Sequence, residues 1–226
     1  MEAISIYIKT NPHIMTPKHI IISALLLSFG LIGKSQTLNR INLKVTNNNT
    51  YIRSVELVAD SVVLHIDMKG NIRMSSIDST DVDYWTQFDG QYKQGKIKSL
   101  GNTEIDYYTN FDGMDKAGKL KSVGDVLITY YDVFDGQQDL GRIKSIGNIQ
   151  FTYNTNLNGL DNIGKLNAIG DEKIVYYDRF DSDKIQGKIK SIGASTINYY
   201  TVFDGDDKNG LLKSISGNDP YINVID

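Results

Sequence analysis

Residues 106–128 read DYYTNFDGMDKAGKLKSVGDVLI, and this unit recurs along the chain with a period of 23 residues. Five similar segments begin at Asp83, Thr129, Thr152, Val175 and Asn198. No insertion or deletion separates the six copies. A fixed period of this length is typical of stacked copies of one supersecondary unit, each burying its apolar face against its neighbours. The sequence therefore predicts a repeat protein over residues 83–226, with six repeats and a terminal strand.

Each copy has the pattern of a β-hairpin. Ile105, Tyr107 and Phe111 alternate with polar positions, and a period of two predicts a half-buried strand whose apolar side chains hold the array together. A second short strand follows at residues 119–123, and Gly124 begins a tight turn. Residues 83–226 show no helical apolar stripe. The predicted fold class is all-β.

Two architectures fit this pattern. One is an elongated antiparallel meander of repeated hairpins, and the other is a parallel β-solenoid with one turn in every 23 residues. The two-residue Gly-Asn and Gly-Asp turns favour hairpins. Residues 36–82 are predicted to form a degenerate β region that caps the open edge of the array, as terminal units of repeat proteins do.

The repeat resembles the MORN repeat. The matching pattern is an aromatic residue, x and glycine, then a Gly-Lys pair and a later glycine, over residues 83–217. In the second copy the matching residues are Phe111, Gly113, Gly118, Lys119 and Gly124. The resemblance implies a single-layer antiparallel sheet of successive hairpins. It also implies a scaffold role, because MORN arrays generally act as scaffolds, with lipid or partner contacts proposed in some.

The first 35 residues are predicted to be a signal peptide. Lys18 and His19 precede an apolar run from Ile20 to Ile32, and small residues before Gln36 suit a signal peptidase. Met15 is an alternative start, and a retained amino-terminal anchor is the alternative function of this segment. The chain has no cysteine, which excludes a lipidated one. The expected location is secreted, periplasmic or on the cell surface, with no membrane contact after cleavage.

Charge argues against nucleic acid as a partner. The whole chain has 24 basic and 27 acidic residues, and removal of residues 1–35 takes away three basic residues and one acidic residue. The remaining net charge of about −5 contrasts with the basic surface of nucleic-acid-binding proteins.

The candidate binding residues form an aromatic row on the strand face opposite the apolar ladder. They are Trp85, Tyr108, Tyr131, Tyr177 and Tyr200. Such a row, framed by polar side chains, is suited to stacking sugar rings or receiving an apolar protein partner. The alternative is that these rings only stabilise the sheet through contacts between neighbouring strands.

The sequence offers little for catalysis or metal binding. Residues 36–226 contain one histidine, His65, and no cysteine. Aspartates such as Asp112 recur in the turns, where they suit either turn formation or calcium, and the nearby lysines are expected to balance them. We therefore expect a non-enzymatic protein without cofactor or metal, which presents an extended β surface to a protein partner or, alternatively, to a polysaccharide.

Overall fold

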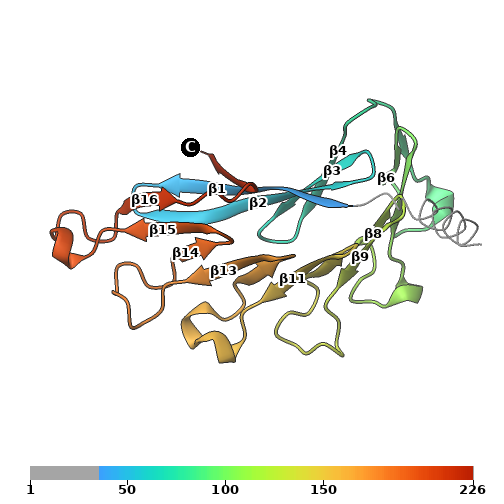
Figure 1. Cartoon of the computed structure of the whole chain (residues 1–226). Coiled ribbons are helices and arrows are strands. Elements are labelled where there is room, and N and C mark those ends of the chain that lie inside the picture. Colours follow the sequence, from blue (N-terminus) through green and yellow to red (C-terminus); the bar gives the residue numbers. More distant parts are fainter. Residues whose placement is uncertain (1–35, 226) are drawn as a thin grey trace, which may run out of the picture. The chain divides into compact units, whose positions relative to one another are not determined.

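The computed structural model describes residues 36–225, in which the regular structure consists of β-strands and single turns of 3-10 helix (Figure 1). The all-β fold class is thus confirmed. The predicted signal peptide at residues 1–35 lies outside the described residues.

The six repeats form one sheet of 12 strands that follow one another in chain order. The strands are β5 (Val82–Tyr84), β6 (Ile97–Leu100), β7 (Thr103–Tyr107), β8 (Leu120–Val123), β9 (Val126–Tyr130), β10 (Ile143–Ile146), β11 (Ile149–Tyr153), β12 (Leu166–Ile169), β13 (Glu172–Tyr176), β14 (Ile189–Ile192), β15 (Ser195–Tyr199) and β16 (Leu212–Ser216). Neighbouring strands pair antiparallel throughout. The meander of hairpins is therefore confirmed, and the solenoid is excluded.

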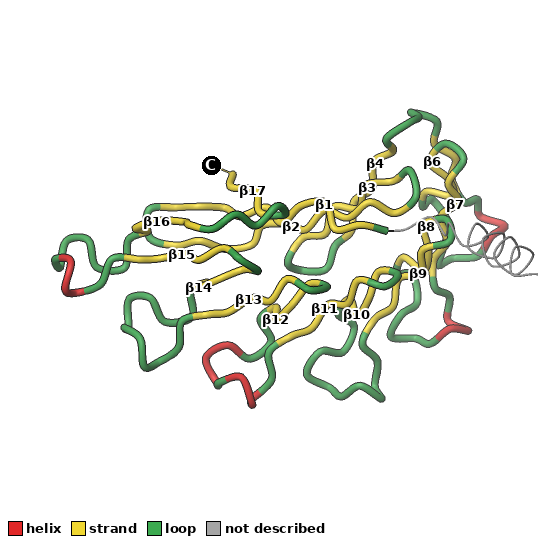
Figure 2. The backbone as a smooth tube through the Cα atoms, viewed as in Figure 1, coloured by secondary structure: helices red, strands yellow, loops and turns green. Residues whose placement is uncertain are grey.

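Two kinds of connection alternate along this sheet. Tight two-residue turns start at glycines with φ between 50° and 57°, as at Gly124 and Gly193, and the residue after each glycine has negative φ. This is the pattern of a type II′ hairpin turn. The other connections are loops of twelve residues, such as residues 108–119. Because the strands alternate in direction, every long loop lies on the same side of the sheet, at the ends of the strands. We call this side the loop edge. These loops carry the 3-10 turns η1 (Gln87–Asp89), η2 (Asn110–Asp112), η3 (Asn156–Asn158), η4 (Leu160–Asn162) and η5 (Val202–Asp204) (Figure 2).

The amino-terminal segment builds a second sheet with the strand order β17-β1-β2-β3-β4. Its strands are β1 (Thr37–Thr46), β2 (Asn49–Ala59), β3 (Val62–Asp67), β4 (Ile72–Ser76) and β17 (Ile222–Ile225). The terminal strand β17 pairs parallel with β1, so it leaves the repeat sheet that we expected it to extend. Strands β1 to β4 likewise form no further unit of the repeat sheet, because they pair with one another and with β17.

The second sheet packs against the repeat sheet. Leu57 and Leu64 from the second sheet share one apolar core with Ile128 and Ile146 from the repeats, and all four side chains are fully buried. Polar contacts join the sheets at their ends: the backbone N–H of Leu212 donates to the carbonyl oxygen of Asn47 at 3.1 Å. The repeat sheet is a single layer as expected, and the second sheet adds another layer over one face.

The predicted row of buried apolar side chains is confirmed for Ile105 and Tyr107 on the strand. The prediction is wrong for Phe111. Ile105 and Tyr107 are buried, but the Phe111 side chain is 94% exposed. The alternation ends at Tyr107, where a register shift marks a bulge, and Phe111 lies in the η2 turn beyond the strand. A period of two cannot be extended through a bulge and a turn.

This difference predicts a large contrast between two alanine substitutions. Ile128→Ala should lower the free energy of unfolding by about 2–5 kcal/mol, because it leaves a cavity in the shared core. Phe111→Ala should change it by less than about 0.5 kcal/mol, as surface substitutions usually do. Urea unfolding of both variants measures the contrast, and equal losses would contradict the assigned positions.

Candidate functional site

Four of the five residues of the predicted aromatic row donate a side-chain hydrogen bond to the backbone of another strand of the repeat sheet. The Tyr108 hydroxyl donates a hydrogen bond of 2.8 Å to the carbonyl oxygen of Ile128 on β9, two strands along the sheet from β7. Tyr131 and Tyr177 donate to the carbonyl oxygens of Phe151 and Ile197, both at 3.0 Å. Trp85 does the same through its indole N–H, which lies 3.1 Å from the Ile105 oxygen. Each of these four side chains therefore bonds to the strand two places further along the sheet.

Burial and neighbouring lysines leave little of these ring surfaces free for a ligand. Tyr108 and Tyr177 are only 8% and 9% exposed, and Trp85, Tyr131 and Tyr200 are half-buried. Lysine ammonium groups also lie over the rings, for example Lys190 at 5.0 Å from the Tyr177 centroid. An exposed row is therefore absent at Tyr108 and Tyr177, whereas Trp85, Tyr131 and Tyr200 keep part of their surface exposed. Whether they bind a ligand stays a prediction.

In the first five repeats, the lysine or arginine that follows the second glycine of the motif forms a link to the next repeat. Lys119 donates to the carbonyl oxygen of Gly141 at 2.8 Å and lies 4.9 Å from the centroid of the Tyr130 ring. The same two contacts recur at Lys165, with Gly187 and Tyr176. They also recur at Lys96, Arg142 and Lys188. Burial lowers the pKa of Lys119 and Lys165, which reflects the partial removal of their ammonium groups from water.

The turn aspartates fix the long loops. In every copy the carboxylate or amide oxygen three residues after the loop's capping residue accepts a hydrogen bond from the capping N–H, at 2.8–3.0 Å. Asp112 shows the arrangement, because it accepts from Thr109 and pairs with Lys121 at 2.9 Å. The backbone N–H of Thr109 and the Lys121 ammonium hold the pKa of Asp112 at about 2. The expected balance between lysines and turn aspartates is thus present in this and three further repeats.

Calcium gains no support from this arrangement. Within residues 36–225, no group of three or more acidic, histidine or cysteine side chains could hold a metal ion. The absence of a metal stays a prediction.

A different set of apolar side chains is exposed at the tips of the loops. We call it the tip row: Phe88, Phe111, Phe134, Leu157, Phe180 and Phe203. Their side chains are 82–96% exposed. One member comes from each repeat, immediately before the aspartate or asparagine that fixes the turn. Since consecutive repeats are two strands apart, the tips are spaced by roughly 10 Å along the loop edge of the sheet.

The sequence contains a signal for the tip row, but the alternation of residues around Phe111 wrongly placed it on the buried face of the strand. The motif Phe-Asp-Gly places the phenylalanine inside a turn, where strand alternation no longer applies. The bulge between Asp106 and Tyr107, which cannot be read from the sequence, shifts the strand end relative to the simple pattern.

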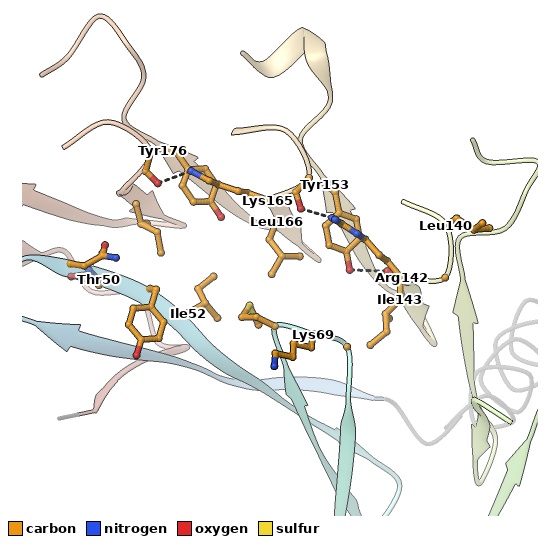
Figure 3. Close-up of a pocket in the computed structure, with 18 residues that line it drawn as sticks. Thr50, Ile52, Lys69, Leu140, Arg142, Ile143, Tyr153, Lys165, Leu166 and Tyr176 are labelled. Carbon is orange, nitrogen blue, oxygen red and sulfur yellow. Dashed lines mark hydrogen bonds between the residues drawn. The ribbon is translucent and has the colours of Figure 1, made fainter. Parts of the chain in front are cut away.

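Two adjacent cavities lie between the sheets. The first, of about 580 Å³, is lined by residues 49–52 and by inward side chains of the repeats, including Ile143, Leu166 and Tyr176. Figure 3 shows Ile52 from the second sheet facing Leu166 of the repeats across this space, with Lys69 and Ile143 further along the same lining. The second cavity, of about 630 Å³, continues along the earlier repeats, and Lys69, Gly70 and Gly141 line both. Together they form what we call the inter-sheet groove.

A carboxyl pair lies where the carboxy-terminal segment meets the repeats. Burial, followed by a hydrogen bond to Asp219, raises the pKa of Glu172 to about 7. Asp219 is itself buried, and its carboxylate accepts from the backbone N–H of Tyr221 at 2.9 Å. The raised pKa of Glu172 predicts that the stability of this junction changes with pH near neutrality.

Comparisons with family models, with curated proteins and with solved structures give no match to this chain. The resemblance to MORN repeats therefore stays a prediction. Among residues 36–225, no helix has the length and apolar character that crossing a membrane requires.

The hydroxyl bonds between strands predict a position-dependent effect of removing a tyrosine hydroxyl. Tyr108→Phe should lower the free energy of unfolding by about 0.5–1.5 kcal/mol, because it removes a buried hydrogen bond. Tyr200→Phe is the matched control, since the Tyr200 hydroxyl bonds to none of the described residues. Urea unfolding measures both, and an equal loss in the control would contradict the role of the link.

The carboxyl pair predicts a loss of stability as the pH rises. The folded state holds the Glu172 proton more tightly than the unfolded chain, in which the pKa is near the ordinary 4.5. The contribution of Glu172 to stability is therefore complete below pH 4.5 and is lost as the pH rises through about 7. Glu172→Gln should reduce the difference in unfolding free energy between pH 5 and pH 8. The exposed Glu104→Gln is the control, and an unchanged difference in Glu172→Gln would contradict the assignment.

Proposed function

We propose that this chain is a non-enzymatic repeat protein that serves as a scaffold and docks a protein partner along its tip row. The observation that carries the proposal is that one apolar side chain per repeat is almost fully exposed at a turn whose backbone is fixed. Phe111 and Phe203, for example, are 94% and 96% exposed.

The tip row supports this proposal because its side chains recur in every repeat without packing in the core. Strand residues such as Ile105 recur because they fill the core, and residues such as Asp112 recur because they fix the loops. The tip row recurs in all six copies although its side chains contribute almost nothing to the core. Exposed apolar side chains gathered on one edge are typical of interaction surfaces, and aromatic residues are enriched at the centres of protein interfaces.

The chemistry of the tip row favours a protein over a polysaccharide. Its members are phenylalanines and Leu157, so they have no polar group to bind sugar hydroxyls, and one copy has no ring to stack on a sugar. Other exposed apolar side chains lie in the same loops, namely Met114, Val133, Leu140, Leu160, Ile163 and Val202. The polysaccharide alternative rested on Trp85 and Tyr108, whose rings are occupied by contacts within the chain. An apolar patch on a protein complements the tip row better.

The proposed location is the cell envelope or the outside of the cell. The proposal rests on the predicted signal peptide at residues 1–35, which lies outside the described residues. A nucleic acid partner is not proposed, given the acidic balance of the chain.

Site-specific photocrosslinking in the native host tests the docking. With p-benzoylphenylalanine in place of Phe111, we expect a discrete crosslinked species that identifies one protein partner. The same group in place of Glu104, an exposed residue on β7 of the same repeat, is the matched control and should give none. The combined Phe88→Ser and Phe134→Ser substitutions should decrease the yield at position 111. Equal crosslinking at positions 111 and 104 would contradict the proposal.

A further inference from the structure

The inter-sheet groove combines an apolar lining with one sign of charge. Leu166 and Ile189 are buried in its wall, and Tyr51, Met68 and Leu140 line its first cavity while remaining 45%, 44% and 38% exposed. Large apolar side chains that stay exposed around a cavity are characteristic of ligand sites. A cavity of about 580 Å³ also falls within the usual size of small-molecule sites.

The charges along the groove are all positive. Lys69, Arg142 and Lys165 line the first cavity, Lys69, Lys96 and Lys119 line the second, and neither lining contains an aspartate or glutamate. This contrasts with the acidic balance of the whole chain. The groove is therefore electrostatically suited to an anion.

Lys69 is the cation that remains available to a ligand. Arg142 and Lys165 already donate to glycine carbonyl oxygens and lie over tyrosine rings. The Lys69 ammonium forms no hydrogen bond or ion pair with the described residues, although it helps to lower the pKa of Asp67 at longer range.

The turn that carries Lys69 is well fixed. The Asp67 carboxylate accepts hydrogen bonds from the backbone N–H groups of Lys69 and Asn71, both at 2.9 Å, and from the Asn71 amide at 2.8 Å. These bonds hold Lys69 at the point where the two cavities meet.

We propose that the inter-sheet groove binds a single-chain anionic amphiphile, such as a fatty acid. Its anionic head pairs with Lys69, and its hydrocarbon chain lies between the sheets beside Ile52, Met68 and Leu166. The apolar wall supplies the binding of the chain, and the unpaired ammonium selects an anionic head over a neutral one. The site is separate from the tip row, so it goes beyond the proposed scaffold function.

Titration of the full-length chain with the fluorescent fatty acid cis-parinarate tests this site. We expect saturable binding that Lys69→Glu weakens by about tenfold or more, because the ion pair is lost and a repulsive charge replaces it. Lys173→Glu makes the same charge change at an exposed position outside both cavities and should leave binding within twofold of the original chain. Melting temperatures of the variants show that each remains folded.

Two further experiments separate the contribution of the anionic head group of the ligand from that of its hydrocarbon chain. Methyl parinarate, which has no charge, should bind the original chain and Lys69→Glu equally, whereas Met68→Asp should weaken both probes. Absence of saturable binding, or equal effects of Lys69→Glu and Lys173→Glu on cis-parinarate, would overturn the proposal. So would loss of binding in Phe111→Ser combined with Phe134→Ser, since the probe would then occupy the tip row. Those tip substitutions leave the groove intact, so the two proposals fail separately.

Discussion

The hydrogen bond from the Gly-Lys lysine to the glycine carbonyl of the next repeat is the interaction on which the array depends. Lys119 shows its two effects, because it satisfies the carbonyl of Gly141 and places its charge against the Tyr130 ring. Backbone pairing alone specifies the position of a strand, whereas this contact ties each long loop to its neighbour. Tyrosine hydroxyls such as that of Tyr108 add a second contact, because they bond to the backbone two strands further along the sheet. Neighbouring repeats are thus held in a fixed relation, and so are the loops that they carry.

The second sheet covers one face of the repeat sheet and so determines which part of that face is open to a ligand. Residues such as Leu57 and Leu64 cover part of the repeat sheet and complete its core. At the hairpin between β3 and β4 the cover is incomplete, and the inter-sheet groove opens beside Lys69. A single layer open on both faces would have no such groove. The two candidate surfaces therefore have different origins, since the tip row follows from the repeats and the groove follows from the second sheet.

The sequence predicted the hairpins well because their signals are local. The fixed period, the glycine at the start of each tight turn and the alternation around Ile105 all reflect single-residue preferences, and the strands follow them. The pairing of β17 with β1 could not be predicted, because it joins residues at opposite ends of the described chain. The roles of Phe111 and Tyr108 were interchanged for a related reason. A bulge ends the alternation, and the hydrogen bond from Tyr108 to Ile128 depends on how strands two places apart are arranged in the sheet.

Hydroxyl-radical footprinting with residue-level mass spectrometry tests this interchange most directly, because it measures the solvent exposure of every ring in one experiment. The account predicts fast oxidation of Phe111, Phe134 and Phe203 and protection of Tyr107, Tyr108 and Tyr130. Protection of those phenylalanines together with fast oxidation of Tyr108 would contradict it. Such a result would make the second aromatic of each repeat the exposed row and return the phenylalanines to the core.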